Sequence, residues 1–236
     1  MINNRIYRTF DRPSRDIVLA FKGIPVANIA DEMNRIACMD AGIRPYNRRP
    51  LLGVAFTVKS VANDNLMFHK AISMAQPGDI IVINGEGSLS HSMCGEFMYR
   101  AAIARGIEGF IVDGAVRDLD ALETLDLSVY ARGAQPNGPY KNGPGEINVH
   151  VCVGGQVVEP GDIIVGDLDG VVVIKKDDAP ELAARARRKL EEERASLDRP
   201  VPVRPPYGYL EPVPCYIDDI IERNGVEFFD RWEGRK

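Results

Sequence analysis

An acidic residue, Glu96, and an adjacent pair of opposite charges, Arg117 and Asp118, form the pattern in this sequence that best suits chemistry. Twenty residues, 97–116, separate Glu96 from the pair. One or two carboxylates can hold a hard divalent cation such as Mg²⁺ while several waters stay bound to it. Arginine offers a rigid fork of donors for a carboxylate or a developing enolate oxygen. Together these groups suit a 2-oxo acid chelated to a metal, in which carbanion character develops beside a polarised ketone.

The stretch before Glu96 adds a candidate anion site. The apolar segment DIIVIN, 79–84, is followed by the loop GEGSLSHSMCG and then by a predicted helix, 95–105, which Gly95 opens. The free N–H groups of a helix N-terminus bind anions, and glycine lets a ligand approach the backbone closely. A plain capped helix, with Glu96 as a helix-dipole carboxylate, gives the same pattern, so the loop alone does not distinguish the two.

Two apolar segments, 79–84 and 109–113, precede the candidate residues and are typical of buried strands. The small residues 114–116 are expected to form a turn into Arg117. If the two strands are neighbours in a parallel sheet, the loops after them open at the same carboxyl edge, where open α/β sheets bind ligands. The charged side chains and the helix amides would then share one pocket.

The rest of the pattern predicts a mixed α/β domain with layered sheets. Helical and strand patterns alternate at first, and short strands dominate from Leu127. The sequence PGDIIV occurs twice, at 77–82 and 160–165, and a recurring turn and strand explains it better than gene duplication. The strands predicted in the second half are 127–132, 147–153, 156–158, 162–167 and 170–174, and a polar helix is predicted over 179–197.

A C-terminal extension is expected beyond this domain. The segment RPVPVRPP, 199–206, is a Pro-rich, extended linker. About thirty residues cannot easily bury many apolar side chains alone. We therefore predict that 199–236 packs on the main domain, 1–198, or on a neighbouring subunit. The prediction of packing rests on the apolar side chains Ile217, Ile220, Ile221, Phe228, Phe229 and Trp232.

The composition limits the class of protein. The chain has 236 residues, of which 45% are hydrophobic and 27% charged, and its formal net charge is −5. This acidic balance argues against a nucleic-acid partner, because non-specific binding needs a basic surface. The four cysteines form no CxxC pair, so we expect reduced thiols in a cytoplasmic protein. Because no signal core and no run of roughly 18 apolar residues occurs, no membrane partner is expected.

Other polar residues have weaker patterns. None of the histidines shows metal-ligand spacing. Asp64 could face the pocket or cap a helix. Asp167 and Asp169 could form a metal pair, but the sequence DLDG is more typical of a turn. Cys94 is adjacent to Gly95 but has no partnered base, so we do not expect it to be a nucleophile.

The spacing from Glu96 to Asp118 resembles the acidic-x20-Arg-Asp signature of the 4-hydroxy-4-methyl-2-oxoglutarate / 4-carboxy-4-hydroxy-2-oxoadipate aldolases. These are class II pyruvate aldolases in the broader family that includes the ribonuclease E inhibitor RraA. The first acid of the signature is commonly Asp, and Glu96 is one methylene longer. The similarity covers roughly residues 20–198. It includes ANDN at 62–65, PGDIIV at 77–82, ARGIEGFIVDGAVRD at 104–118, GPGEINV at 143–149 and PGDIIVGDLDGVVVI at 160–174.

The resemblance implies a role for each candidate residue. Asp118 would be the direct protein ligand of Mg²⁺ or Mn²⁺, and Glu96 would hold the metal through water. Arg117 would hydrogen-bond the ketone oxygen and stabilise the enolate. A glutamate from the last helix of a neighbouring subunit would also reach the metal waters. Glu193, in the run 191–193, is the favoured match, and a solvated helix face is the alternative. The amides that would bind the pyruvyl carboxylate are those of Gly95, Glu96, Phe97 and Met98.

The implied fold is α/β, an RraA-like swivelling β/β/α domain with layered mixed sheets, assembled as homotrimers or homohexamers with sites between subunits. The implied activity is metal-dependent aldol cleavage of a 4-hydroxy-2-oxo di- or tricarboxylic acid to pyruvate and a second 2-oxo acid. Oxaloacetate decarboxylation would be a side activity. Further substrate carboxylates would need cations, and the candidates are Lys70, Arg100, Arg132 and Lys141.

Two other functions are alternatives to this activity. A protein-binding regulator of ribonuclease E, like RraA, is the alternative, although a pure binding module has no need of the set Glu96, Arg117 and Asp118. A methyltransferase is disfavoured because no Gly-rich GxGxG-type loop follows a first strand.

Overall fold

The computed structural model describes residues 3–198 and 217–227. The chain divides into two units, Met1–Asp198 and Arg199–Lys236. In the second unit the described residues include a short helix, α7 (Asp218–Arg223). The predicted linker at 199–206 lies outside the described residues, and the packing of the extension stays a prediction. Among the helices that are described, none is both long and apolar enough to cross a bilayer.

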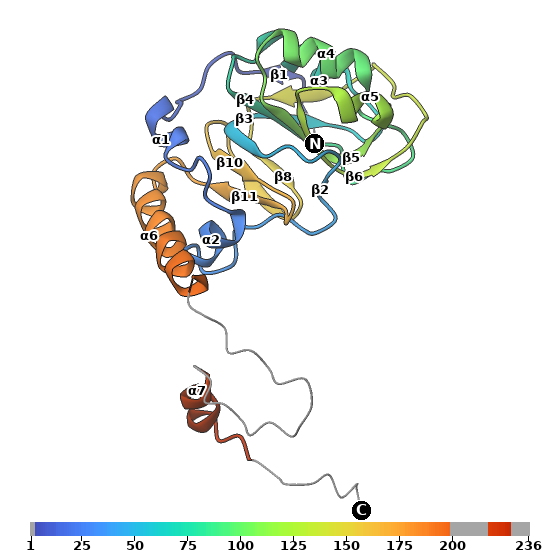
Figure 1. Cartoon of the computed structure of the whole chain (residues 1–236). Coiled ribbons are helices and arrows are strands. Elements are labelled where there is room, and N and C mark those ends of the chain that lie inside the picture. Colours follow the sequence, from blue (N-terminus) through green and yellow to red (C-terminus); the bar gives the residue numbers. More distant parts are fainter. Residues whose placement is uncertain (1–2, 199–216, 228–236) are drawn as a thin grey trace, which may run out of the picture. The chain divides into compact units, whose positions relative to one another are not determined.

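The first unit is built on a mixed sheet with a parallel centre (Figure 1). Its strands and those of a small hairpin are β1 (Arg5–Ile6), β2 (Arg44–Pro45), β3 (Leu51–Ser60), β4 (Asp79–Asn84), β5 (Gly109–Val116), β6 (Ser128–Ala134), β7 (Gly145–Ile147), β8 (Val151–Val153), β9 (Gln156–Val158), β10 (Ile163–Gly166) and β11 (Val171–Ile174). The main order is β1-β7-β3-β4-β5-β6-β2, and β3 to β6 run parallel. β10 pairs antiparallel with β3 and with β11, and β8 pairs with β9.

Helices cover the sheet in two groups. α3, α4 and α5 pack on one face, and α1, α2 and α6 pack against β10 and β11 (Figure 1). The mixed α/β architecture with layered sheets is the one that the sequence predicts, and α6 has the predicted bounds. The helices are α1 (Arg15–Leu19), α2 (Val26–Asp31), α3 (Leu66–Met74), α4 (Glu96–Ala104), α5 (Leu119–Thr124) and α6 (Ala179–Leu197).

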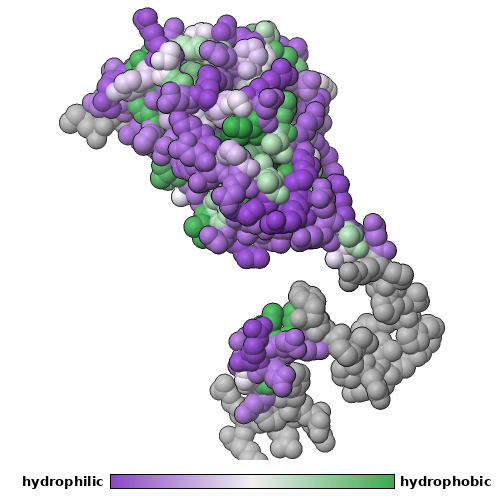
Figure 2. Space-filling model, turned by 90° about the vertical axis from the view of Figure 1, so that its left-hand side faces the viewer, coloured by the Kyte–Doolittle hydropathy of each residue, from purple (hydrophilic) through white to green (hydrophobic). Residues whose placement is uncertain are grey.

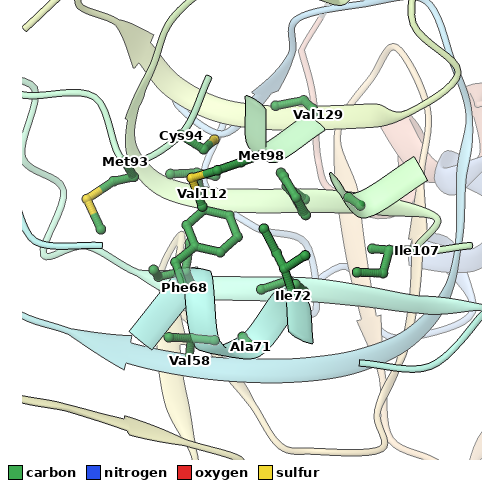
Figure 3. Close-up of a cluster of buried hydrophobic side chains, with 14 of the residues drawn as sticks. Val58, Phe68, Ala71, Ile72, Met93, Cys94, Met98, Ile107, Val112 and Val129 are labelled. Atoms are coloured by element: carbon green, nitrogen blue, oxygen red, sulfur yellow. The ribbon is translucent and has the colours of Figure 1, made fainter. Parts of the chain in front are cut away.

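The central strands are buried on both faces. Along β4, Ile81 and Ile83 join the cluster beneath the helices, whereas Ile80 and Val82 join the cluster with β8, β10 and β11. Successive side chains of a strand point to opposite faces, so a continuous apolar run fits a strand covered on both sides. Figure 3 shows the helix-side cluster, in which Phe68 of α3 lies among side chains of the sheet and of the segment before α4.

Among the predicted strands, one is three residues longer in the structure and another is interrupted. The strand predicted at 109–113 continues to Val116, so residues 114–116 belong to β5 and do not form the expected turn. Its pairing with β6 shifts register between Val112 and Ala115. The strand predicted at 147–153 is interrupted by Asn148, whose φ is 57°. The two halves have different partners, because β7 pairs with β3 and β8 pairs with β9.

The two copies of PGDIIV form the same local structure. Asp79 and Asp162 are both buried, and each accepts the N–H group three residues earlier at 2.8 Å. Each carboxylate also pairs with a cation, Asp79 with Arg12 and Asp162 with Lys175. These shared contacts support the interpretation as a recurring turn and strand. They also show that the buried carboxylates of Asp79 and Asp162 are each paired with a cation from another part of the chain.

Replacing Arg12 with lysine is expected to lower the free energy of unfolding by about 1–2 kcal/mol. Arg12 donates from both terminal nitrogens to the two carboxylate oxygens of Asp79, which is fully buried, and a lysine cannot make both contacts. Urea denaturation measures the difference. The matched control is Arg15→Lys on the exposed side of α1, which should leave the midpoint unchanged. Equal midpoints for the two variants would show that the paired contact contributes nothing.

The face drawn in Figure 2 is largely hydrophilic. Figure 2 shows one face on which polar side chains surround a smaller group of apolar ones near the centre of the larger unit. Among the described residues, Phe97 is the large hydrophobic side chain with the greatest exposure, 89%. It lies in the first turn of α4. An apolar side chain is therefore presented to solvent beside the candidate residues.

Candidate active site

The candidate residues gather where the end of β5 meets the start of α4. β4 and β5 are parallel neighbours, which meets the condition under which the loops after them open at the same edge. The segment before α4 then runs alongside the end of β5. The N–H of Met93 donates to the carbonyl of Ala115 at 2.7 Å, and the N–H of Arg117 donates to the carbonyl of Cys94 at 3.1 Å. These hydrogen bonds bring Gly95 next to Arg117 and the residue after it.

Gly95 is the point of closest approach between the two segments. A Cβ atom at this position would lie 2.3 Å from Oδ2 of Asp118 and 2.9 Å from Cγ of Arg117. Such distances are far inside van der Waals contact, so any other residue would displace both charged side chains. The arrangement of the pair therefore depends on glycine at position 95.

Asp118 is held in an uncommon backbone conformation. Its φ and ψ are 60° and 46°, in the left-handed region that few residues except Gly, Asn and Asp adopt. Oδ2 accepts the N–H of Glu96 at 2.9 Å and lies 3.6 Å from Nε of Arg117. Oδ1 accepts no hydrogen bond from the described residues, and the side chain is 39% exposed. One carboxylate oxygen is thus open to a ligand.

Arg117 and Asp118 line a cavity of about 300 Å³. Nη1 of Arg117 makes a long hydrogen bond, 3.4 Å, to the carbonyl of Pro136. A guanidinium has five N–H donors, so most of them stay available to a molecule in the cavity. The remaining walls come from Leu119, Ala134, Gln135 and Pro136.

The amides predicted to bind a carboxylate are not equivalent. The N–H of Glu96 is taken by Asp118, and the N–H of Met98 donates to the carbonyl of Gly95 at 2.9 Å. The N–H groups of Gly95 and Phe97 have no acceptor within the part of the chain that is described. The side chain of Met98 is buried in the helix-side cluster (Figure 3). Gly95 and Phe97 are therefore the amides that remain for an anion.

Glu96 is paired within its own helix. Its Oε1 accepts from Nε and Nη2 of Arg100, at 2.7 and 2.6 Å, in an i,i+4 ion pair. Its side chain does not line the cavity of Arg117 and Asp118. Across residues 3–198 and 217–227 there is no group of three or more His, Cys, Asp or Glu side chains placed to hold a metal. Among the described residues, Asp118 supplies the one carboxylate in the cavity wall.

Within one chain, the structure does not place Glu193 beside the other candidate residues. It lies on α6, where its carboxylate meets Asn28 and Lys189. In Figure 1, α6 lies at the other end of the unit from α4 and α5. Its contribution from a neighbouring subunit stays a prediction.

Tyr99 belongs to the site, although the sequence patterns did not single it out. It is fully buried on α4, and its hydroxyl donates to the carbonyl of Arg117 at 2.8 Å. Burial raises the pKa of Tyr99, so the hydroxyl keeps the proton that it donates. Burial also raises the pKa of Cys94, which agrees with a thiol that is not a nucleophile. The sequence signal that could have identified Tyr99 is a tyrosine on the buried face of a predicted helix. Buried tyrosine hydroxyls usually form a hydrogen bond.

Three further candidates, Asp64, Asp167 and Arg132, have structural partners. Asp64, two residues before α3, accepts the N–H groups of Leu66 and Gly143 at 2.9 and 3.0 Å, so it joins the start of α3 to a loop. Asp167 accepts N–H groups in its own turn and at the start of α2. Arg132 is paired with Asp113 and Asp40, which leaves it less able to bind a substrate carboxylate.

A larger cavity, of about 400 Å³, lies at the opposite ends of the strands. Its walls include Glu108 and Ser128, at the amino ends of β5 and β6. Burial raises the pKa of Glu108, and the negative charge of Asp126 raises it further. Open α/β sheets bind ligands at the carboxyl ends of their strands, so the smaller cavity is the candidate site.

The chain belongs to the RraA-like family, described as Aldolase/RraA, because the family model matches residues 26–173. The match runs from the start of α2 into β11 and includes Gly95, Arg117 and Asp118. A protein of Halalkalibacterium halodurans named "Putative 4-hydroxy-4-methyl-2-oxoglutarate aldolase" is 37% identical over 201 residues, which are 83% of this chain and 94% of that protein.

Solved structures share the fold. An uncharacterized protein from Pseudomonas syringae superposes with a TM-score of 0.73 at 24% identity, over 80% of this chain and 90% of that one. The RNA-processing inhibitor RraA from Thermus thermophilis gives a TM-score of 0.59 at 27% identity, over 64% of this chain and 92% of that one. The predicted RraA-like α/β fold is therefore confirmed.

Proposed function

We propose that the protein is a lyase, a class II pyruvate aldolase that depends on Mg²⁺ or Mn²⁺. It would cleave a 4-hydroxy-2-oxo di- or tricarboxylic acid, of the 4-hydroxy-4-methyl-2-oxoglutarate or 4-carboxy-4-hydroxy-2-oxoadipate type, to pyruvate and a second 2-oxo acid. The observation that carries the proposal is the cavity where Arg117 and Asp118 lie side by side against Gly95. The name of the Halalkalibacterium halodurans relative supports it.

The donor set fits a hard divalent cation. Oδ1 of Asp118 is a carboxylate oxygen without a hydrogen-bond donor among the described residues, at the wall of a cavity that water can enter. Mg²⁺ and Mn²⁺ are commonly held by one or two carboxylates while other positions keep water or substrate oxygens. Asp118 would hold the ion directly, and Glu96 and Glu193 of a neighbouring subunit would hold it through water. The bound ion would act as a Lewis acid that polarises the substrate ketone.

The residues of the chain would bind and orient the substrate. The N–H groups of Gly95 and Phe97, at the start of α4, would bind the carboxylate of the 2-oxo acid. A base would take the proton of the C4 hydroxyl as the C3–C4 bond breaks, so that C4 becomes the carbonyl of the second 2-oxo acid. Arg117 would donate to the ketone oxygen at C2 and stabilise the negative charge that develops there. The resulting enolate takes a proton to give pyruvate. Loss of CO₂ from oxaloacetate passes through the same enolate, so the site would also catalyse that decarboxylation.

The proposed reaction is tested by pyruvate release from 4-hydroxy-4-methyl-2-oxoglutarate. With Mg²⁺ or Mn²⁺ present, the protein is expected to release pyruvate continuously, and excess EDTA is expected to reduce the rate to below about a tenth, because one carboxylate retains the ion weakly. Addition of Mn²⁺ in excess of EDTA should restore the rate. Full activity in excess chelator would refute the metal dependence, and no pyruvate from any 4-hydroxy-2-oxo acid would refute the reaction.

A second function is a protein-binding regulator of ribonuclease E. The likeness to the RNA-processing inhibitor RraA from Thermus thermophilis favours it. The two functions differ in what they need from Arg117 and Asp118, because binding of a protein partner requires no open carboxylate in a cavity. Capture of ribonuclease E by the immobilised protein, together with no turnover of any 4-hydroxy-2-oxo acid, would favour the regulator.

The proposed assembly is a homotrimer or a homohexamer with sites between subunits. In such an assembly the carboxylate of Glu193 would reach the metal site of a neighbouring subunit. Within its own chain it contacts only Asn28 and Lys189 among the described residues.

A further inference from the structure

The segment that starts α4 holds the backbone on both sides of Arg117. The N–H of Arg117 donates to the carbonyl of Cys94 at 3.1 Å, and the carbonyl of Arg117 accepts from the hydroxyl of Tyr99 at 2.8 Å. The carboxylate of Asp118 accepts the N–H of Glu96 at 2.9 Å. Tyr99 is the side chain in this set that reaches the Arg117–Asp118 peptide from the core.

The position of Tyr99 makes its hydroxyl a fixed point. The residue is fully buried, and its ring lies 6.3 Å from the ring of Phe110 on β5. Its helix is anchored in the core by the buried side chain of Met98 (Figure 3). A hydroxyl that cannot move fixes the plane of the peptide whose carbonyl it binds, and that plane links Arg117 to Asp118.

The peptide needs such support because Asp118 adopts the left-handed conformation. A residue other than glycine stays in this conformation only when several surrounding contacts hold it in place. If the peptide plane rotates, φ of Asp118 changes and its carboxylate turns away from the cavity. The orientation of the open Oδ1 therefore depends on the carbonyl of the preceding residue.

We propose that Tyr99 is a positioning residue, whose hydroxyl holds the Arg117 carbonyl and thereby aims the carboxylate of Asp118 at a divalent cation in the cavity. This inference rests on the proposed function, because it assigns Asp118 to the ion. Tyr99 itself touches neither the ion nor the substrate. Loss of its hydroxyl would weaken binding of the ion without changing the charge of the site.

The chain supplies a matched control for the test. Tyr130 is also fully buried, and its hydroxyl donates to a backbone carbonyl, that of Asp167, at 3.0 Å. Asp167 lies in the turn between β10 and β11, and Tyr130 is not in the wall of the candidate cavity. Phenylalanine at either position keeps the ring and removes one buried hydroxyl. Tyr99→Phe and Tyr130→Phe should therefore lose similar amounts of thermal stability.

The two variants are expected to differ in their affinity for Mn²⁺. Electron paramagnetic resonance of free Mn²⁺ should give a Kd about tenfold higher for Tyr99→Phe than for the wild type, the size typical of residues that orient a metal ligand. Tyr130→Phe should bind Mn²⁺ like the wild type. Pyruvate release at limiting Mn²⁺ should follow the same order, and saturating Mn²⁺ should restore most of the rate of Tyr99→Phe.

Equal Mn²⁺ affinity in the two variants would overturn the positioning role. This failure can be told apart from failure of the proposed function. If the wild type binds Mn²⁺ but releases no pyruvate, the reaction is refuted while the comparison of the variants still tests Tyr99. If the wild type binds no Mn²⁺ at all, both are overturned.

Discussion

Asp118→Asn is expected to lower kcat/KM for pyruvate release by about 10³-fold, because a charged ligand of the ion contributes several kcal/mol to the transition state. Asparagine tolerates the left-handed conformation of this position and keeps an oxygen for the N–H of Glu96. The backbone should therefore stay in place while the negative charge is lost. A coupled assay for pyruvate with saturating Mn²⁺ measures the effect.

The control for this substitution lies two residues further along the chain. Asp120 is an exposed carboxylate in the first turn of α5, and it does not line the cavity. Asp120→Asn should keep the wild-type rate, since it makes the same change of charge without touching the site. An Asp118→Asn protein that retained more than about a tenth of the wild-type rate would remove Asp118 from the proposed metal site.

Gly95→Ala is expected to lower kcat/KM by about 10²-fold while the protein stays folded, because a displacement of about 1 Å in a site costs that much. The φ of Gly95 is −161°, an extended conformation that alanine adopts without strain. The added methyl group would instead lie 2.3 Å from Oδ2 of Asp118 and 3.0 Å from Nε of Arg117. The effect should therefore come from displacement of the two charged side chains and not from the backbone.

Thermal unfolding separates this loss from general destabilisation. The Tm of Gly95→Ala should stay within a few degrees of the wild type, because the groups that must move are about 40% exposed and have room to do so. A drop in activity that merely followed a large drop in Tm would not support the close approach as its cause. Wild-type kcat/KM in a stable Gly95→Ala protein would show that the pair can be displaced without loss, against the proposed site.

Much of the fold follows from local patterns. Apolar runs bounded by turn residues identify β4 and β10, and the polar helical pattern over 179–197 identifies α6 with its observed bounds. The parallel pairing of β4 and β5 was a condition of the site hypothesis, and the structure meets it. The interruption at Asn148 could not be predicted in this way, because an apolar run does not reveal that its two halves pair with different strands.

Local sequence patterns also predict part of the candidate site. Arg117 and Asp118 follow a strand directly, so the sheet alone places them at its carboxyl edge. The ion pair of Glu96 with Arg100 could have been read from the i,i+4 spacing. The bond from Tyr99 to the Arg117 carbonyl could not, because it depends on how α4 packs across the end of β5.

The pairing of β3 bears on how the chain acquires its fold during synthesis. One edge of β3 receives β4, which the ribosome adds soon after it, whereas the other edge receives β7 and β10, which end at residues 147 and 166. Until those residues emerge, a long apolar strand presents an open row of N–H and C=O groups to other nascent chains. Delayed closure of that edge would therefore expose the nascent chain to aggregation before the sheet is complete.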